Sequence, residues 1–176
     1  MTNCNHSGTG VRGVKKWIGG RKWDVIHFNF GIWDTHYLHN GILVTDRSKY
    51  KTEDLKCRYT TEQYVENLSK IVAILKETDA KLIWASTTPY VSYGEDTRLL
   101  VVKNNKAARE LMAREEVTVN DLYNIALANL KEWQSKDGCH FTRQGYEELA
   151  RQVAPTISDA LSKKARAVKP ATVDGQ

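Results

Sequence analysis

Two side chains that could exchange a proton lie three positions apart near the carboxyl end of the chain. Asp137 and His140 are separated by Gly138 and Cys139, and Thr142 follows where a helix is expected to begin. Histidine loses its proton near neutral pH, and a neighbouring carboxylate can fix its tautomer and stabilise the imidazolium. The spacing indicates a general base with an orienting carboxylate. An isolated Asp-x-x-His sequence more often ends a turn, so a second motif is needed.

The second motif is residues 23–34, which read as a strand that runs into a glycine turn. An almost continuous apolar run precedes Gly31, as in a strand covered on both faces: Val25, Ile26, Phe28 and Phe30. Asn29 shares strand parity with Gly31. Its amide could therefore point toward the crevice at the carboxyl ends of the strands, where open α/β sheets bind ligands.

In this order and with helices between them, the two stretches resemble the SGNH (GDSL-like) hydrolases, esterases that remove acyl groups, often acetyl groups on carbohydrates. Residues 137–142 with Gly145 look like the last sequence block of that family, in which the histidine is the general base and the aspartate orients it. Residues 23–34 look like its third block, whose Gly-x-Asn-Asp reads Gly31-Ile32-Trp33-Asp34 here. Trp33 thus stands where the oxyanion-hole asparagine is expected. The resemblance covers roughly residues 3–160.

The nucleophile of that family is missing. Its first block is a strand that ends in Gly-Asp-Ser, and this tripeptide occurs nowhere in the 176 residues. Residues 3–10, which include Gly8, look like the second block, so we expect the sequence to be amino-truncated and the first strand to be absent. Ser7 lies within that second block, and Cys139 adjoins His140 in a loop where neighbours point apart, so neither is favoured as a replacement.

The resemblance implies acyl transfer to water without a metal or cofactor. His140 would take the proton of a serine, Asp137 would hold the imidazole, and amides near Gly31 and Gly8, with Asn29, would stabilise the oxyanion. Trp33 and Asp34 are further candidate substrate-binding residues. The expected partner is a small-molecule or carbohydrate ester. An inactive carbohydrate-binding or partner-binding module is the alternative, although the retained dyad favours the esterase.

The elements around these motifs alternate between helix and strand. Helical spacing or capping marks residues 9–20, 60–76, 96–113, 121–130 and the segment after Thr142, and strands are expected at 23–30, 81–89 and 117–120. This order predicts an α/β fold, a three-layer α/β/α sandwich with a mostly parallel sheet, which the resemblance narrows to a flavodoxin-like sheet. We expect one domain over 1–161 and a disordered basic tail over 162–176.

Residues 35–59 are polar and aperiodic and predict a long loop. Trp33, Tyr37 and the two histidines at 36 and 39 could form a stacking wall for a sugar ring. A metal bound by His36-x-x-His39 is not favoured, because no cysteine or carboxylate follows at suitable spacing.

Composition sets wider limits. The formal charge is +5, but residues 162–176 carry +3 of it, so neither a nucleic acid nor a membrane partner is expected. No apolar run reaches the roughly 18 residues of a membrane span. Three cysteines do not indicate a disulfide framework. The family is often exported and a signal peptide would precede these residues, so the compartment and the oligomeric state stay open.

Overall fold

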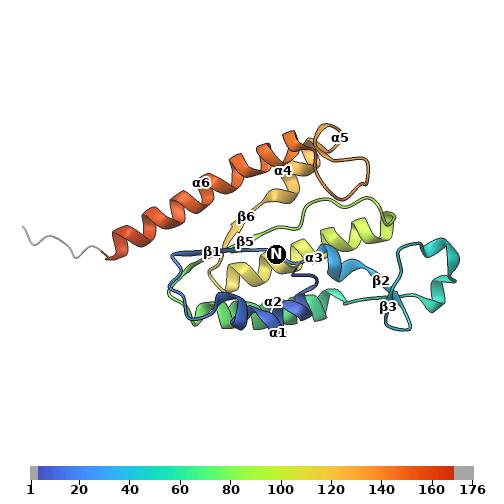
Figure 1. The fold of residues 1–176 in the computed structure, drawn as a ribbon, viewed down its shortest axis with the longest axis horizontal. Helices are drawn as coiled ribbons and strands as arrows, with labels where there is room; N and C mark the ends of the chain where they lie inside the picture. Colours follow the sequence, from blue (N-terminus) through green and yellow to red (C-terminus); the bar gives the residue numbers. More distant parts are fainter. Residues whose placement is uncertain (1–3, 169–176) are drawn as a thin grey trace, which may run out of the picture.

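The computed structural model describes residues 4–168, with side chains through residue 166. A parallel sheet lies at its centre, in the order β1 (Val25–Phe28), β5 (Lys81–Ala85), β6 (Thr118–Asn120). Helices α1 (Ser7–Ile18), α2 (Thr61–Lys76) and α3 (Glu95–Arg114) pack on one another. They cover one face of the sheet, and α4 (Leu122–Ala128), α5 (Leu130–Trp133) and α6 (Arg143–Val168) lie on the other side (Figure 1). The predicted three-layer α/β/α sandwich is confirmed.

The core fills the space between the sheet and the first layer of helices. The apolar stripe of α2 is fully buried there, against Trp84 of β5 and Met112 of α3. The capping box predicted at the start of α2 is present, since the Thr60 hydroxyl accepts from Gln63 N–H and the Gln63 side chain accepts from Thr60 N–H. The sequence pattern therefore fixes this helix at both its start and its buried face.

Strand β1 lies at an edge of the sheet. Among the described residues it pairs only with β5, with Val25 opposite Lys81 and Phe28 opposite Trp84. All four of its residues are half-buried, whereas the apolar run predicted a strand covered on both faces. No strand from residues 4–168 pairs with the outer backbone edge of β1. The expected first strand of a flavodoxin-like sheet would lie at this edge.

The expected loop over residues 35–59 is wrong, because much of this segment forms a small antiparallel sheet. It contains β2 (Tyr37–His39), β3 (Ile42–Leu43) and β4 (Lys56–Cys57) in the order β3-β2-β4, with 3-10 turns at Ile32–Thr35, Arg47–Lys49 and Thr52–Asp54. Asn40 and Gly41 join β2 to β3 with φ of 48° and 79°. Positive φ at both central residues is what a type I′ hairpin turn requires, and Asn-Gly is its commonest sequence.

The predicted disordered tail is also corrected over part of its length. Helix α6 continues to Val168, so residues 162–168 are helical. Lys164 explains the extension, because its ammonium donates to the Trp23 carbonyl at 3.0 Å and lies 3.2 Å from the Asp24 carboxylate. Residues 169–176 of the expected tail lie outside the described part of the chain. Within that part, no helix combines the length and apolarity needed to cross a bilayer.

Candidate active site

The loop between α5 and α6 is closed by its own hydrogen bonds. Ser135 N–H donates to the His140 carbonyl at 2.9 Å, and Gly138 N–H donates to the Ser135 carbonyl at 3.0 Å. Gly138 has a φ of 67°, a conformation that favours glycine. Thr142 caps α6 as predicted, since its hydroxyl accepts from Gly145 N–H at 3.1 Å. The chain therefore presents residues 137–140 on a compact loop.

Asp137 and His140 are hydrogen-bonded to each other. His140 Nδ1 lies 2.6 Å from Asp137 Oδ2, although both side chains are largely exposed. The other carboxylate oxygen, Oδ1, accepts from the backbone N–H groups of Cys139 and His140 at 2.9 Å and from the Ser135 hydroxyl at 2.7 Å. Four donors thus hold one carboxylate in place.

These donors set the charge of the pair. The hydrogen bond from His140 lowers the pKa of Asp137 most, followed by those from Cys139 N–H, the Ser135 hydroxyl and His140 N–H. Since an ionised carboxylate only accepts, Nδ1 of His140 carries the proton toward Asp137, and Nε2 is the nitrogen free to accept one. No described hydroxyl is hydrogen-bonded to Nε2. The pair is arranged as a general base that awaits a proton donor.

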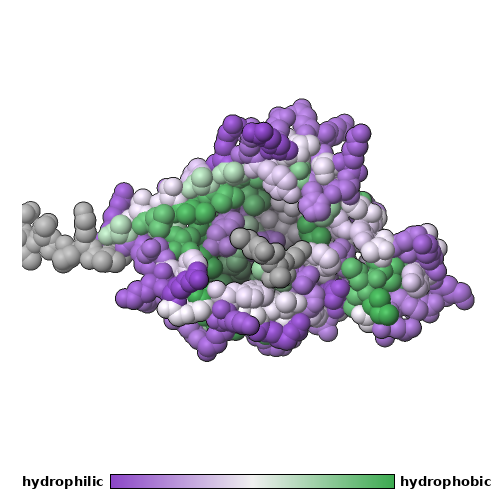
Figure 2. Space-filling view, viewed as in Figure 1, coloured by the Kyte–Doolittle hydropathy of each residue, from purple (hydrophilic) through white to green (hydrophobic). Residues whose placement is uncertain are grey.

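His140 lines a cavity of about 570 Å³, and Asn29, Gly31 and Trp33 line the same cavity. The structure therefore brings the histidine and the glycine turn together at the carboxyl edge of the sheet, while Asp137 supports His140 from outside the cavity wall. Apolar side chains form much of the lining: Leu122, Phe141, Tyr146, Leu149 and Val153. In Figure 2 the apolar surface follows α6 along the rim of a hollow. Apolar walls exclude water and strengthen polar interactions at the site.

Gly31 lies where two strand ends approach closely. A Cβ built on it would come within 1.9 Å of Thr87 Oγ1, which donates to the Phe30 carbonyl at 3.1 Å. Asn29 is tied to the same place, because its amide donates to the Ala85 carbonyl at 2.7 Å and to Thr87 Oγ1 at 3.2 Å. Both amide hydrogens of Asn29 are engaged within the protein, which corrects the expectation that they face a substrate oxyanion.

Gly8 and Asp34 lie behind the cavity rather than in its wall. Both are buried, and Gly8 packs against the Tyr59 hydroxyl. Asp34 accepts from Ser7 N–H at 3.0 and 3.1 Å and from the Ser7 hydroxyl, so it caps the start of α1. Burial raises the pKa of Asp34 to about 6, although the Ser7 hydrogen bonds act to lower it. The position predicted to bind substrate is thus occupied by a residue that anchors a helix.

Solved structures of similar fold include three hydrolases. The chain is 22% identical to the lipase/acylhydrolase of Enterococcus faecalis, with a TM-score of 0.65 over 92% of this chain and 72% of that one. It is 14% identical to a carbohydrate esterase family 3 protein of Talaromyces cellulolyticus, with a TM-score of 0.67 over 90% and 69%. It is also 14% identical to a GDSL-like lipase of Bacteroides thetaiotaomicron, with a TM-score of 0.64 over 90% of this chain and 72% of that one. The chain has the SGNH-hydrolase fold.

No family model and no curated protein matches the sequence, so the fold is recognised through structure. The three SGNH-fold structures named above are longer than this chain, which spans about 70% of each. Activity must accordingly be argued from the site itself.

Neither alternative nucleophile is placed for attack in this SGNH fold. Ser7 is fully buried, and its hydroxyl donates to Asp34 and accepts from Asn67 at 3.0 Å. Cys139 borders the cavity, but burial raises the pKa of its thiol, so the reactive thiolate is disfavoured at neutral pH. Among the described residues, the general base has no nucleophile beside it.

Two functional features were missed in the sequence. Ser135 supports Asp137 from two residues upstream, and the Ser-x-Asp-Gly spacing of a turn was the available signal. His36, predicted at the surface of a loop, is buried between Trp33 and Tyr93, with ring centroids 4.9 and 5.0 Å away. His36 therefore cannot offer the open face that the expected stacking wall of Trp33, His36, Tyr37 and His39 requires.

Proposed function

We propose that this chain provides the general base, the orienting carboxylate and the substrate cavity of a serine esterase that removes acyl groups, acetyl among them, from a carbohydrate. The observation that carries the proposal is the His140–Asp137 pair, in which four donors, His140 Nδ1 among them, hold the carboxylate while His140 borders a cavity. A hydrogen-bonded base at the carboxyl edge of a parallel sheet is what acyl transfer needs.

The reaction would follow from the protonation states of the pair. His140 Nε2 takes the proton of a serine hydroxyl as the serine oxygen attacks the ester carbonyl, and Asp137 stabilises the resulting imidazolium. The imidazolium then protonates the leaving alcohol, and an acyl-serine forms. Water, deprotonated by the same nitrogen, releases the acid and the serine. Backbone N–H groups at the Gly31 turn are candidate donors to the oxyanion, because Gly31 borders the same cavity as His140.

The serine would come from a strand that lies outside residues 4–168. Two features support this step. The outer edge of β1 is unpaired among the described residues, and apolar residues of α6 border the cavity beside it. An unpaired parallel edge with an apolar cover favours the addition of a strand. A strand paired in parallel with β1 would end at the same edge as His140, as every parallel strand of the sheet does.

Carbohydrate as the alcohol component rests on the aromatic lining of the cavity. Trp33 and Tyr146 both border it, and Tyr146 is 52% exposed. Aromatic faces stack on the apolar faces of sugar rings and leave the sugar hydroxyls to polar neighbours such as Asn29. The structural likeness to the Talaromyces cellulolyticus carbohydrate esterase is consistent with this choice.

Hydrolysis of p-nitrophenyl acetate tests the proposal. The 176-residue chain should show only background rates, and a version extended by a strand that ends in Gly-Asp-Ser should turn over at about 1–1000 per second. His140→Ala in the extended version is the matched control and should return the rate to background. Turnover by the unextended chain that is lost in Ser7→Ala would contradict the proposal, as would an extended and folded protein without activity.

Two observations favour the alternative, a carbohydrate-binding module without activity. Trp33 occupies the position of the expected oxyanion asparagine, and both amide hydrogens of Asn29 are engaged elsewhere. A site without side-chain donors could still bind a sugar ester, but it would stabilise the oxyanion of the transition state poorly. Sugar affinity equal in His140→Ala and in the unaltered chain, without hydrolysis by the extended version, would establish the module.

A further inference from the structure

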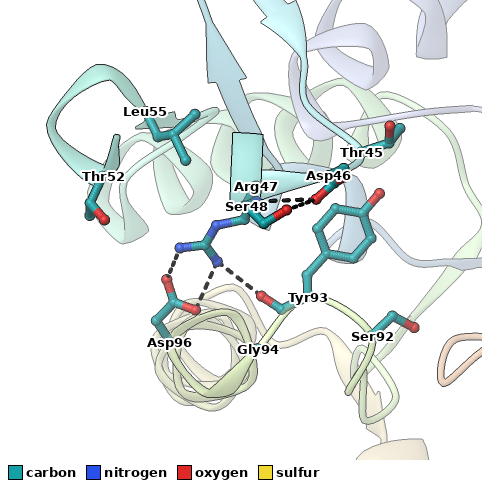
Figure 3. A pocket seen from close by; sticks show the side chains of 10 residues that line it. All are labelled: Thr45, Asp46, Arg47, Ser48, Thr52, Leu55, Ser92, Tyr93, Gly94 and Asp96. Carbon is teal, nitrogen blue, oxygen red and sulfur yellow. Dashed lines mark hydrogen bonds and ion pairs between the residues drawn. The ribbon is translucent and has the colours of Figure 1, made fainter. Parts of the chain in front are cut away.

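A second cavity of about 540 Å³ adjoins the loop of residues 135–140, here called the dyad loop because it carries Asp137 and His140. The cavity lies on the side of the small antiparallel sheet. The Arg47–Lys49 turn and Thr52 form one side, and Ser92 and Tyr93 form the other (Figure 3). The Ser92 hydroxyl donates to the Asp137 carbonyl, and Val91 N–H donates to the Gly138 carbonyl at 2.9 Å. This cavity and the dyad loop therefore share a wall.

The charges at the floor of this cavity are balanced, and their side chains are hydrogen-bonded to one another. Arg47 donates to both carboxylate oxygens of Asp96 at 2.9 and 2.7 Å and to the Tyr93 carbonyl at 2.9 Å. Its guanidinium lies 3.9 Å from the centre of the Tyr37 ring, and the Tyr37 hydroxyl donates to Asp96 at 2.8 Å. Because Arg47 is matched by Asp96, it offers little net charge to an anionic ligand.

The remaining lining combines hydroxyl groups with apolar faces. Thr45, Ser48, Thr52 and Ser92 supply hydroxyls, while Leu55 and the Tyr93 ring supply apolar surface. A neutral sugar presents the same combination, with hydroxyls that donate and accept around rings of C–H groups. The Asp46 carboxylate accepts from Ser48 N–H at 3.1 Å and pairs with the Lys49 ammonium at 3.3 Å, so it also adds little net charge to the lining.

A row of rings joins the two cavities. Trp33 borders the cavity of His140, Tyr93 borders the second cavity, and His36 lies between them, in contact with both rings. His36 is 6% exposed, its Nε2 lies 3.2 Å from the Tyr90 hydroxyl, and its Nδ1 has no hydrogen-bond partner among the described residues. Because His36 is buried, this row is a packed connection between the walls of the two cavities and not a path for a ligand. The two cavities adjoin across the dyad loop, where Ser92 and Val91 contact Asp137 and Gly138 and where His140 borders the other cavity.

We propose that the second cavity is a sugar-binding subsite, which holds a neighbouring unit of an oligosaccharide whose ester lies at His140. This inference rests on the proposed function for its placement along the substrate. It commits the substrate class to neutral oligosaccharide esters of two or more units. The small antiparallel sheet is then the part of the chain that selects oligosaccharides over single sugars.

Binding of neutral trisaccharides tests the subsite in the 176-residue chain. Xylotriose, cellotriose and chitotriose would each be titrated into the ¹⁵N-labelled protein while the amide signals of Thr52, Ser92 and Gly94 are followed. We expect at least one trisaccharide to shift these signals. Thr52→Trp, which fills the cavity from an exposed position, should weaken its binding by about tenfold or more, equivalent to 1.4 kcal/mol.

Thr118→Trp is the matched control, because Thr118 is also exposed and lies at a separate cavity beside the start of β6. It should leave the affinity unchanged. Thr45→Trp provides a second filling variant in case Thr52→Trp fails to fold. The subsite is overturned if no trisaccharide shifts these amides, or if neither filling variant weakens binding. Sugar binding at this cavity without hydrolysis by the extended protein would refute the proposed function while supporting the subsite.

Discussion

Asp137 and Asp34 are the same chemical group in opposite surroundings. Asp137 is exposed, and its donors lower its pKa. Asp34 is fully buried, and burial raises its pKa to about 6 despite comparable hydrogen bonds from Ser7. Each contacts one short segment, the loop of residues 135–140 in the first case and the start of α1 in the second. The difference teaches that the balance between desolvation and hydrogen bonding sets the pKa of a carboxylate: hydrogen bonds dominate at exposed Asp137, and desolvation outweighs them at buried Asp34.

The largest expected effect is on catalysis, at His140, the partner of the exposed carboxylate of Asp137. His140→Ala in the strand-extended protein should lower kcat by about 10⁶-fold, because it removes the only described group poised to take the proton. The free energy of unfolding should change by less than about 0.5 kcal/mol, since the side chain is largely exposed. Stopped assays of p-nitrophenyl acetate and urea titration measure the two. A large loss of stability would show that the loop, rather than the base, was disrupted.

Asp137→Asn should follow with a loss of about 10⁴-fold in kcat, since the amide favours the wrong histidine tautomer. The lowered pKa of Asp137 keeps it ionised throughout the neutral range, so it should add no inflection to the rate profile between pH 5 and 8. Asp24→Asn is the control at an exposed carboxylate. An inflection that disappears in Asp137→Asn would contradict the ionised state.

Asp34→Ala should act on stability, with a loss of about 2–4 kcal/mol, because Ser7 N–H and its hydroxyl would be left buried without an acceptor. Urea unfolding measures this loss. Helical content should fall at α1 before the dyad loop is affected, and hydrogen exchange of the α1 amides would locate it. Unchanged stability would mean that water replaces the carboxylate.

The pH dependence of unfolding sharpens the comparison. The folded pKa of Asp34, about 6, is above its unfolded value of 3.8, so its stabilising contribution is complete below pH 3.8 and is lost as the pH rises through 6. Asp34→Asn should therefore cost more stability at pH 4 than at pH 7.5, by about 2 kcal/mol. Urea midpoints at the two pH values give the difference. A larger cost at pH 7.5 would reverse the sign and refute the raised pKa.

The smallest effect is expected at Ser135. Ser135→Ala removes one of four donors to Asp137 and should lower kcat about threefold to tenfold, equivalent to roughly 0.5–1.5 kcal/mol, with KM unchanged. Ser135→Thr keeps the hydroxyl and should restore most of the rate. Loss of activity in both variants alike would indicate a role in loop packing instead.

The sequence predicted what depends on local pattern. The α2 stripe and cap and the Asp137–His140 pair follow from neighbours a few residues apart. The flavodoxin-like sheet, in contrast, was implied by the family resemblance. It did not predict the partner of Asp34, because the contact with Ser7 spans 27 residues and no periodicity encodes it. The Asn40-Gly41 pair is a sequence signal for a hairpin turn, but the polar and aperiodic character of residues 35–59 led to the prediction of a loop.

Helix α6 was predicted too short for a related reason. The apolar stripe ends at Leu161, and the residues beyond it are polar and basic. What continues the helix is the contact of Lys164 with Trp23 and Asp24, residues about 140 positions away. The polar and basic composition of residues 162–168 therefore led to a prediction of disorder, whereas these residues are helical.

The outer edge of β1 is unpaired among residues 4–168, and this affects how the stability of the protein is defined. If a strand binds there from another molecule, folding and association are linked, and each tenfold rise in its free concentration above the dissociation constant adds about 1.4 kcal/mol. The melting temperature then depends on that concentration, as it does for obligate dimers.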